Sequence, residues 1–110
     1  MAAELDETLL ALADPARRRV IDLLGREPCR SGELAEALAL SRPAMSRHLR
    51  VLRRAGLVEE ASLAEDARVR VYRLRREPFV ALREWLEDVE GFWVEQLAAF
   101  KRHAEGRRRH

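Results

Sequence analysis

Hydrophobic residues recur at steps of three and four along most of the chain, which is the period of amphipathic helices. The spacing predicts five helices, over residues 4–12, 15–24, 32–39, 42–55 and 78–104. Two further segments, 57–61 and 68–74, alternate β-branched or aromatic residues with charged ones, which predicts two strands joined by a hairpin tip at residues 64–67. The expected fold is therefore mainly α with one small β-hairpin.

Residues with strong capping preferences mark the expected ends of these helices. Asp14 precedes Pro15 and is the expected N-cap of the second helix. Ser31 and Ser41 are the expected N-caps of the third and fourth helices, and Gly56 supplies a left-handed stop after the fourth. Two helices joined by a very short turn and followed by a hairpin predict a winged helix-turn-helix.

The helix predicted over residues 42–55 has an aliphatic face and an arginine face. At about 100° per residue, Met45, Leu49 and Leu52 fall within about 60° of one another and form the expected buried side. An arginine stripe opposite such a seam fits the major groove of DNA, because guanidinium forks suit phosphate and guanine edges. The expected groove contacts are Arg42, Pro43, Ser46, Arg47 and Arg50, with Arg54 further along meeting phosphate or an acid.

Three residues beside this arginine face complete the helical part of the expected DNA-binding set. Ser31 and Ser41 stand at helix starts, where free N–H groups can bind phosphate. His48 lies at the edge of the buried seam, so we expect it to pack or to bond phosphate rather than to bind a metal or act in catalysis.

Two arginines of the hairpin, Arg68 and Arg70, share one strand face, and two interpretations of them stay equally open. They contact the minor groove or its phosphates, or they pair with Glu59 and Glu60 across the strand ladder.

The last predicted helix carries more apolar surface than one small domain can bury. Its stripe runs through Leu82, Leu86, Val89, Trp93, Leu97 and Phe100, and is widened by Trp85 and Phe92. This excess predicts a homodimer formed by the first and last helices. The expected interface residues are Leu5, Leu9, Leu12, Leu86, Val89, Phe92, Trp93, Leu97 and Phe100. Residues 1–105 form the expected domain, and residues 106–110 a basic flexible tail.

Charge is distributed unevenly along the 110 residues, whose net charge is +2. Residues 30–54 carry +4 and residues 77–105 carry −4, which favours one nucleic-acid-binding surface over a uniformly basic one. The one cysteine, Cys29, excludes a disulfide framework and indicates a reducing, cytoplasmic compartment. No apolar run is long enough to span a bilayer, so we expect no membrane partner.

Three segments together resemble the ArsR-type winged-helix transcriptional repressors: LADPARRRVIDLL, GELAEALALSRPAMSRHLRVLRRAGLVEE and RVRVYRL. The resemblance implies a homodimer that binds dyad-symmetric operator DNA through a recognition helix at Arg42–Ala55, and it leaves room for a small-molecule inducer. In the helix-turn-helix turn, Ala39 stands where the family often has glycine.

The metal sites of this family do not match the chain. Arg30-Ser31-Gly32 stands where metal-sensing members often carry Cys-x-Cys, with Cys29 one place outside. The histidines His103 and His110 do not have the spacing of the zinc ligands that other members carry on the last helix. We therefore expect no metal and no other cofactor.

Two alternatives to a plain repressor stay open at this point. One is the same repressor gated by a metal or by oxidation of Cys29, and the other is a winged helix used for protein contact. An enzyme is the least favoured interpretation, because the chain has no Gly-rich phosphate loop, no paired carboxylates in a plausible cleft and no nucleophile–base pair.

Overall fold

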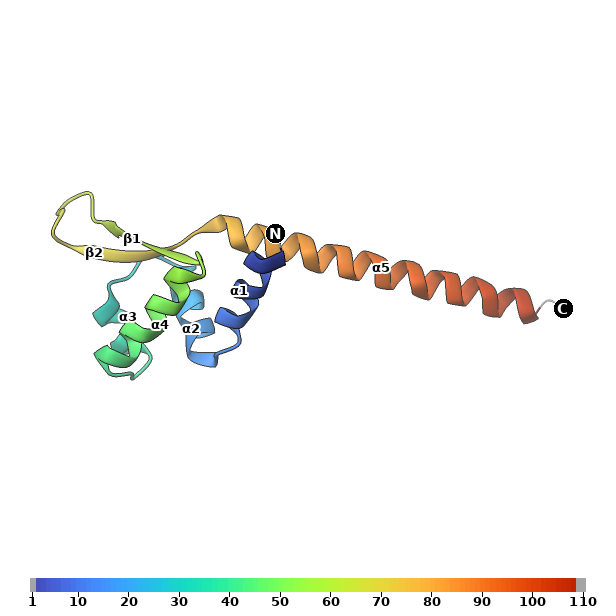
Figure 1. The fold of residues 1–110 in the computed structure, drawn as a ribbon, viewed down its shortest axis with the longest axis horizontal. Helices are drawn as coiled ribbons and strands as arrows, with labels where there is room; N and C mark the ends of the chain where they lie inside the picture. The colour runs from blue at the N-terminus through green and yellow to red at the C-terminus, as the bar shows by residue number, and fades with distance from the viewer. Residues whose placement is uncertain (1, 109–110) are drawn as a thin grey trace. The chain divides into compact units, whose positions relative to one another are not determined.

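The computed structural model describes residues 2–108, which form five helices and one two-stranded antiparallel sheet (Figure 1). In chain order these are α1 (Ala2–Leu12), α2 (Pro15–Leu24), α3 (Ser31–Ala37), α4 (Arg42–Arg54), β1 (Val58–Ser62), β2 (Arg70–Leu74) and α5 (Arg76–Arg108). Residues up to Phe79 form one compact unit and those from Val80 onward form another. This element order confirms the predicted α+β class and the helix-turn-helix followed by a hairpin, which we call the wing (residues 58–74).

An aliphatic core holds the first unit together. Its fully buried large side chains are Val20, Leu34, Met45, Leu49, Leu52, Leu57 and Val58. Burying each such side chain contributes about 1.5–3 kcal/mol, so α4 is fixed chiefly through its three core residues. The predicted seam of α4 is confirmed, because Met45, Leu49 and Leu52 are at most 2% exposed. The opposite face of α4 is thereby turned to solvent.

The turns at the two ends of α4 both use a left-handed residue. Ala39 has a φ of 55° and Gly56 a φ of 76°. At each place the next N–H reaches back to a helix carbonyl, from Leu40 to Ala35 at 2.9 Å and from Leu57 to Leu52 at 3.0 Å. An alanine in this conformation costs on the order of 1 kcal/mol relative to glycine.

The N-caps of α2 and α4 are those that the sequence predicts. The Asp14 carboxylate accepts the backbone N–H of Ala16 at 2.8 Å, and the Ser41 hydroxyl accepts that of Ala44 at 3.2 Å. The prediction that Ser31 caps α3 was wrong. Arg30 has the extended backbone of an N-cap, and its N–H donates to the Glu33 carboxylate at 2.9 Å, so Ser31 is already the first helical residue.

A third segment of the chain pairs with the wing beside its two strands. Strand β1 pairs antiparallel with β2 from Val58 opposite Leu74 to Ser62 opposite Arg70. In addition, Cys29 exchanges two backbone hydrogen bonds with Tyr72, at 3.1 and 2.7 Å. This bridge ties β2 to the segment between α2 and α3, and supports a hairpin that would be marginal by itself.

Helix α5 is longer than predicted at both ends. It begins two residues before Pro78, which lies in the first turn, where its missing N–H has no intrahelical partner to lose. It continues to Arg108, so the predicted end at residue 104 was too early and residues 106–108 of the expected tail are helical. Residues 109–110 lie outside the described residues. Within residues 2–108, no helix has the length and apolar content that a membrane span needs.

The apolar stripe of α5 is open to solvent in the second unit. Phe92 is 65% exposed and Phe100 72%, and four further side chains of the stripe are exposed as well: Leu86, Val89, Trp93 and Leu97. Leu82, near the start of the stripe, is half-buried. In α1, Leu9 is exposed and Leu5 half-buried, whereas Leu12 packs against the core of its own unit. The open apolar surface of α1 also includes Leu10, which the sequence analysis did not single out.

Candidate nucleic-acid interface

The solvent face of α4 carries arginines without acidic partners. Arg47, Arg50 and Arg54 are exposed, and within residues 2–108 none of them lies within ion-pair distance of a carboxylate. The same holds for Arg42 at the start of the helix. Unpaired guanidiniums on a rigid helix keep all their donors available for phosphate or for a guanine edge.

The polar and small residues predicted beside these arginines are also on the surface. Pro43 and Ser46 are exposed on α4, and Ser41 is exposed while its hydroxyl caps the helix. Ser31 is exposed in the first turn of α3.

His48 lies away from the arginine face and is half-buried. It lies close enough to Asp14, the N-cap of α2, to affect the carboxylate electrostatically. The pKa of Asp14 lies below its ordinary value chiefly because its carboxylate accepts the Arg17 backbone N–H, with smaller contributions from the Ala16 N–H and from the charge of His48. The position of His48 thus favours a packing role toward α2 over a direct base contact.

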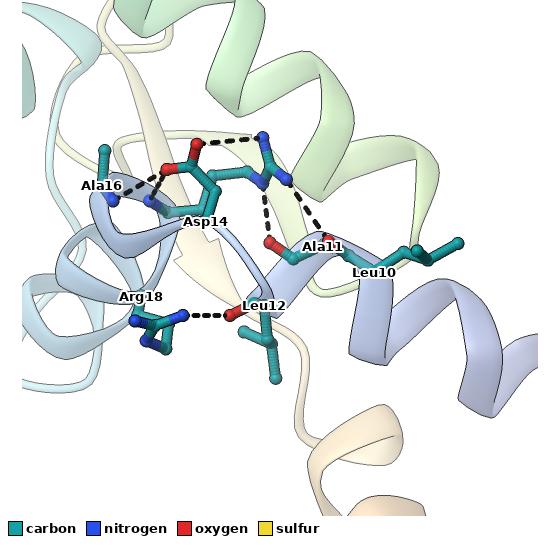
Figure 2. A network of polar contacts seen from close by, with 7 residues as sticks. Leu10, Ala11, Leu12, Asp14, Ala16 and Arg18 are labelled. Carbon is teal, nitrogen blue, oxygen red and sulfur yellow. Dashed lines mark hydrogen bonds and ion pairs between the residues drawn. The ribbon is translucent and has the colours of Figure 1, made fainter.

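The junction of α1 and α2 is held by two arginines whose role the sequence analysis missed (Figure 2). Arg17 donates through Nε to the Ala11 carbonyl at 2.6 Å and through Nη2 to the Leu10 carbonyl at 3.3 Å. Arg18 donates to the Leu12 carbonyl at 2.7 Å. These carbonyls belong to the last turn of α1, where helix carbonyls lose their intrahelical partners. The Leu10 carbonyl also accepts the Ala13 N–H at 3.2 Å. The two arginines of α2 therefore cap α1, which only the three-dimensional arrangement reveals.

The wing arginines are paired with acids, unlike those of α4. Arg70 donates to Glu60 at 3.4 Å and to the Ser62 hydroxyl at 2.9 Å. This agrees with the second interpretation of Arg70, in which it pairs across the ladder. Arg68 does not pair with Glu59 or Glu60, as the second interpretation expects, because its contact is Asp66 at 3.3 Å in the hairpin tip. A contact of Arg68 with DNA stays a prediction. The backbone and side-chain donors of Arg68 lower the pKa of Asp66.

A shallow hollow of about 550 Å³ separates the start of α3 from the wing. Its charged lining consists of four arginines and two glutamates: Arg30, Arg42, Arg68, Arg70, Glu33 and Glu36. The excess of guanidinium groups gives the hollow a net positive charge. It extends from the wing to the start of α4, because Arg42, the first residue of that helix, is part of its lining.

The one thiol of the chain is a poor redox centre as it stands. Cys29 is half-buried, and burial raises the pKa of its thiol, with further increases from the charges of Glu33 and Glu27. A thiol with a raised pKa carries little thiolate at neutral pH, and the thiolate is the reactive form. Within residues 2–108, no three His, Cys, Asp or Glu side chains come together as a metal site requires, and His110 lies outside that range.

The chain is similar in sequence and in structure to known transcriptional regulators. A family model described as a helix-turn-helix domain matches residues 12–61. The chain is 39% identical over 95 residues to the HTH-type transcriptional regulator Rv2034 of Mycobacterium tuberculosis, a match that covers 86% of this chain and 83% of the relative. A solved ArsR-like transcriptional regulator from Rhodococcus sp. RHA1 has a TM-score of 0.78 and 33% identity, with 92% of both chains covered. The chain belongs to the ArsR-type family of helix-turn-helix transcriptional regulators.

This ArsR-type regulator also resembles a protein named as a repressor. The transcriptional repressor SdpR of Bacillus subtilis is 32% identical over 56 residues, which cover 51% of this chain and 62% of the relative. The family assignment confirms the expectation of a DNA-binding transcriptional regulator and of a winged-helix fold.

Proposed function

We propose that this ArsR-type regulator is a homodimeric repressor that binds a dyad-symmetric operator, with α4 of each protomer in the major groove. The observation that carries the proposal is the arginine face of α4. Arg47, Arg50 and Arg54 are exposed and lack acidic partners within the described chain, while the opposite side of the same helix is buried. In this arrangement Arg47 and Arg50 bind guanine edges, and Arg54 binds a phosphate.

The hollow beside α4 supports a place for the DNA backbone. A phosphodiester there would meet Arg42, which has no acidic partner within residues 2–108, together with the exposed Ser31. Contacts of this kind fix the register of a protein on the duplex without reading sequence. Arg68 and Arg70 can join them only by exchanging their present partners, Asp66 and Glu60, for phosphate.

The exposed apolar faces of α1 and α5 support the dimer. Leu9 and Leu10 of α1 and the stripe of α5 from Leu86 to Phe100 leave a large apolar area in water within a single chain. Such area is characteristic of a surface that a second protein copy covers. A twofold dimer would place two α4 helices on half-sites about one helical turn apart.

The proposal also includes that the chain represses transcription and that it catalyses no reaction. The name of SdpR in Bacillus subtilis supports the repressor role, and a dimer seated on an operator blocks access to that DNA. We infer that the chain acts in the cytoplasm by binding alone, with any small-molecule inducer acting through the same DNA-bound dimer.

Selection of bound duplexes from a random pool tests the proposal, with Arg47→Ala and Arg83→Ala compared with the wild type. We expect the wild type to enrich a dyad-symmetric site. Arg47→Ala should weaken binding to that site by about 1–3 kcal/mol and relax the preference at one base pair in each half-site. Arg83→Ala is the matched control, because Arg83 lies on α5 and its one ion-pair partner within residues 2–108 is Glu87 at 3.8 Å. An Arg47→Ala protein with wild-type affinity and selectivity would contradict the assignment of α4.

A further inference from the structure

One carboxylate connects the recognition helix to the wing. Glu60 of β1 accepts from Arg53 of α4 at 3.2 Å through Oε2, and from Arg70 of β2 at 3.4 Å through Oε1. Its side chain is only 20% exposed, whereas the two arginines are each more than half exposed. We call these three residues the Glu60 bridge.

The Glu60 bridge stands at the edge of the DNA-facing surface. At about 100° per residue, Arg53 lies about 60° around α4 from Arg50 and on the same flank as Arg42. Arg70 and Arg42 both line the hollow between α3 and the wing. Glu60 thus pairs with two guanidinium groups, while the neighbouring arginines of α4 have no acidic partner within the described chain.

A glutamate between two arginines occupies the place that a DNA phosphate would take. Both groups are anions with paired oxygens that accept guanidinium N–H donors. While Glu60 holds Arg53 and Arg70, these two side chains add little to the sequence-independent attraction of the surface, and the glutamate itself repels the DNA backbone.

We propose that Glu60 is a specificity-determining residue, which restrains Arg53 and Arg70 from binding the phosphates of non-operator DNA. The inference rests on the proposed function, in which α4 and the hollow face DNA. It assigns to Glu60 the task of lowering non-specific affinity while leaving Arg47 and Arg50 free to contact bases.

The expected effect follows from counterion release. Each additional phosphate contact makes the slope of log K against log salt more negative by about 0.9. If the contacts add nothing at about 1 M salt, one freed arginine strengthens binding about fivefold at about 0.15 M, and two strengthen it about thirtyfold.

The experiment measures binding of a short mixed-sequence duplex by fluorescence anisotropy between about 50 and 200 mM salt. In Glu60→Gln we expect about fivefold to thirtyfold tighter binding and a slope steeper by about 0.9–1.8. Glu59→Gln is the matched control, since it removes the same charge one residue away, where the partners are Arg73 at 2.7 Å and Arg75 at 3.9 Å. It should leave both quantities close to the wild type.

The inference is overturned if Glu60→Gln and Glu59→Gln behave alike, whether both are tight or both are unchanged. Should Glu60→Gln lose its fold by circular dichroism, Arg53→Gln and Arg70→Gln decide the question instead. Arginines held by Glu60 contribute little to non-specific binding, so each variant should keep the wild-type slope, and a shallower slope would overturn the inference. A wild-type protein with no salt dependence at all would overturn the proposed function itself.

Discussion

The contact of Arg17 with the end of α1 leads to a quantitative prediction about stability. Replacing Arg17 by Met keeps an unbranched apolar stem on α2 but removes every donor that reaches α1. The Nε–Ala11 bond at 2.6 Å and the Nη2–Leu10 bond at 3.3 Å are both lost, as is the longer contact with Asp14 at 3.9 Å (Figure 2).

The size of the loss depends on how far each contact is shielded from water. The Arg17 side chain is 17% exposed, and a hydrogen bond from a charged donor in such a place contributes about 1.5–3 kcal/mol. We take the lower value for the partly buried Ala11 bond, because a terminal helix carbonyl can partly recover its bonding with water. The exposed Leu10 bond and the ion pair with Asp14 each contribute about 0.5 kcal/mol. We expect Arg17→Met to cost about 2–3 kcal/mol.

Thermal unfolding followed by circular dichroism measures this cost. For a chain of this length the loss corresponds to a fall in Tm of about 10 °C. All variants must be compared at one protomer concentration, because association shifts Tm. Arg19→Met is the matched control, since Arg19 is exposed on the same helix and has no side-chain ion pair within residues 2–108. If the two variants unfold within about 0.5 kcal/mol of each other, Arg17 does not cap α1 in solution.

Two further predictions concern the stability of the fold at low pH and the helix α5. The pKa of Asp14 is lowered in the folded state from its ordinary value of 3.8, so its carboxylate adds stability above that pH and the contribution is lost as the pH falls through the lower folded value. In urea titrations the stability difference between wild type and Asp14→Asn should therefore shrink between about pH 5 and pH 2, and a constant difference would refute the assignment. Gly91 lies inside α5 about 160° from the centre of the apolar stripe, and no atom stands within 4 Å of an added Cβ. Gly91→Ala should stabilise the helix by up to about 1 kcal/mol without weakening the proposed dimer in sedimentation, and weaker association would show that this face of α5 is also covered.

Much of α4 was predictable because its signals are local. The spacing of Met45, Leu49 and Leu52 fixes which side of α4 is buried, and the arginine face follows from the same helical period. Ser41 with Pro43 and Gly56 determine where α4 starts and stops, and the structure places the boundaries there.

The contacts that the sequence did not predict join residues far apart in the chain or compete for one partner. The strand contact between Cys29 and Tyr72 joins two segments that share no pattern. Ser31 has a capping side chain, yet Arg30 is the N-cap, because Glu33 three residues later accepts its N–H. The alternation of residues in the hairpin predicts that Arg68 and Arg70 share one face. It does not predict that Arg68 pairs with Asp66 at the tip, while only Arg70 pairs with Glu60.

The acidic partners of the arginines divide them into two groups that composition alone does not distinguish. Seven arginines lie between residues 42 and 70, and by charge alone they are equivalent. Three of them, Arg53, Arg68 and Arg70, are held by Glu60 or Asp66, whereas four on α4 have no acidic partner within residues 2–108. A paired guanidinium must exchange one anion for another to bind DNA, so its net gain is small, while an unpaired one gains the whole contact. The basic segment is therefore not a uniformly attractive surface. Its unpaired charge is concentrated on α4, and in the proposed complex the wing attracts the DNA backbone only after its own acids have been displaced.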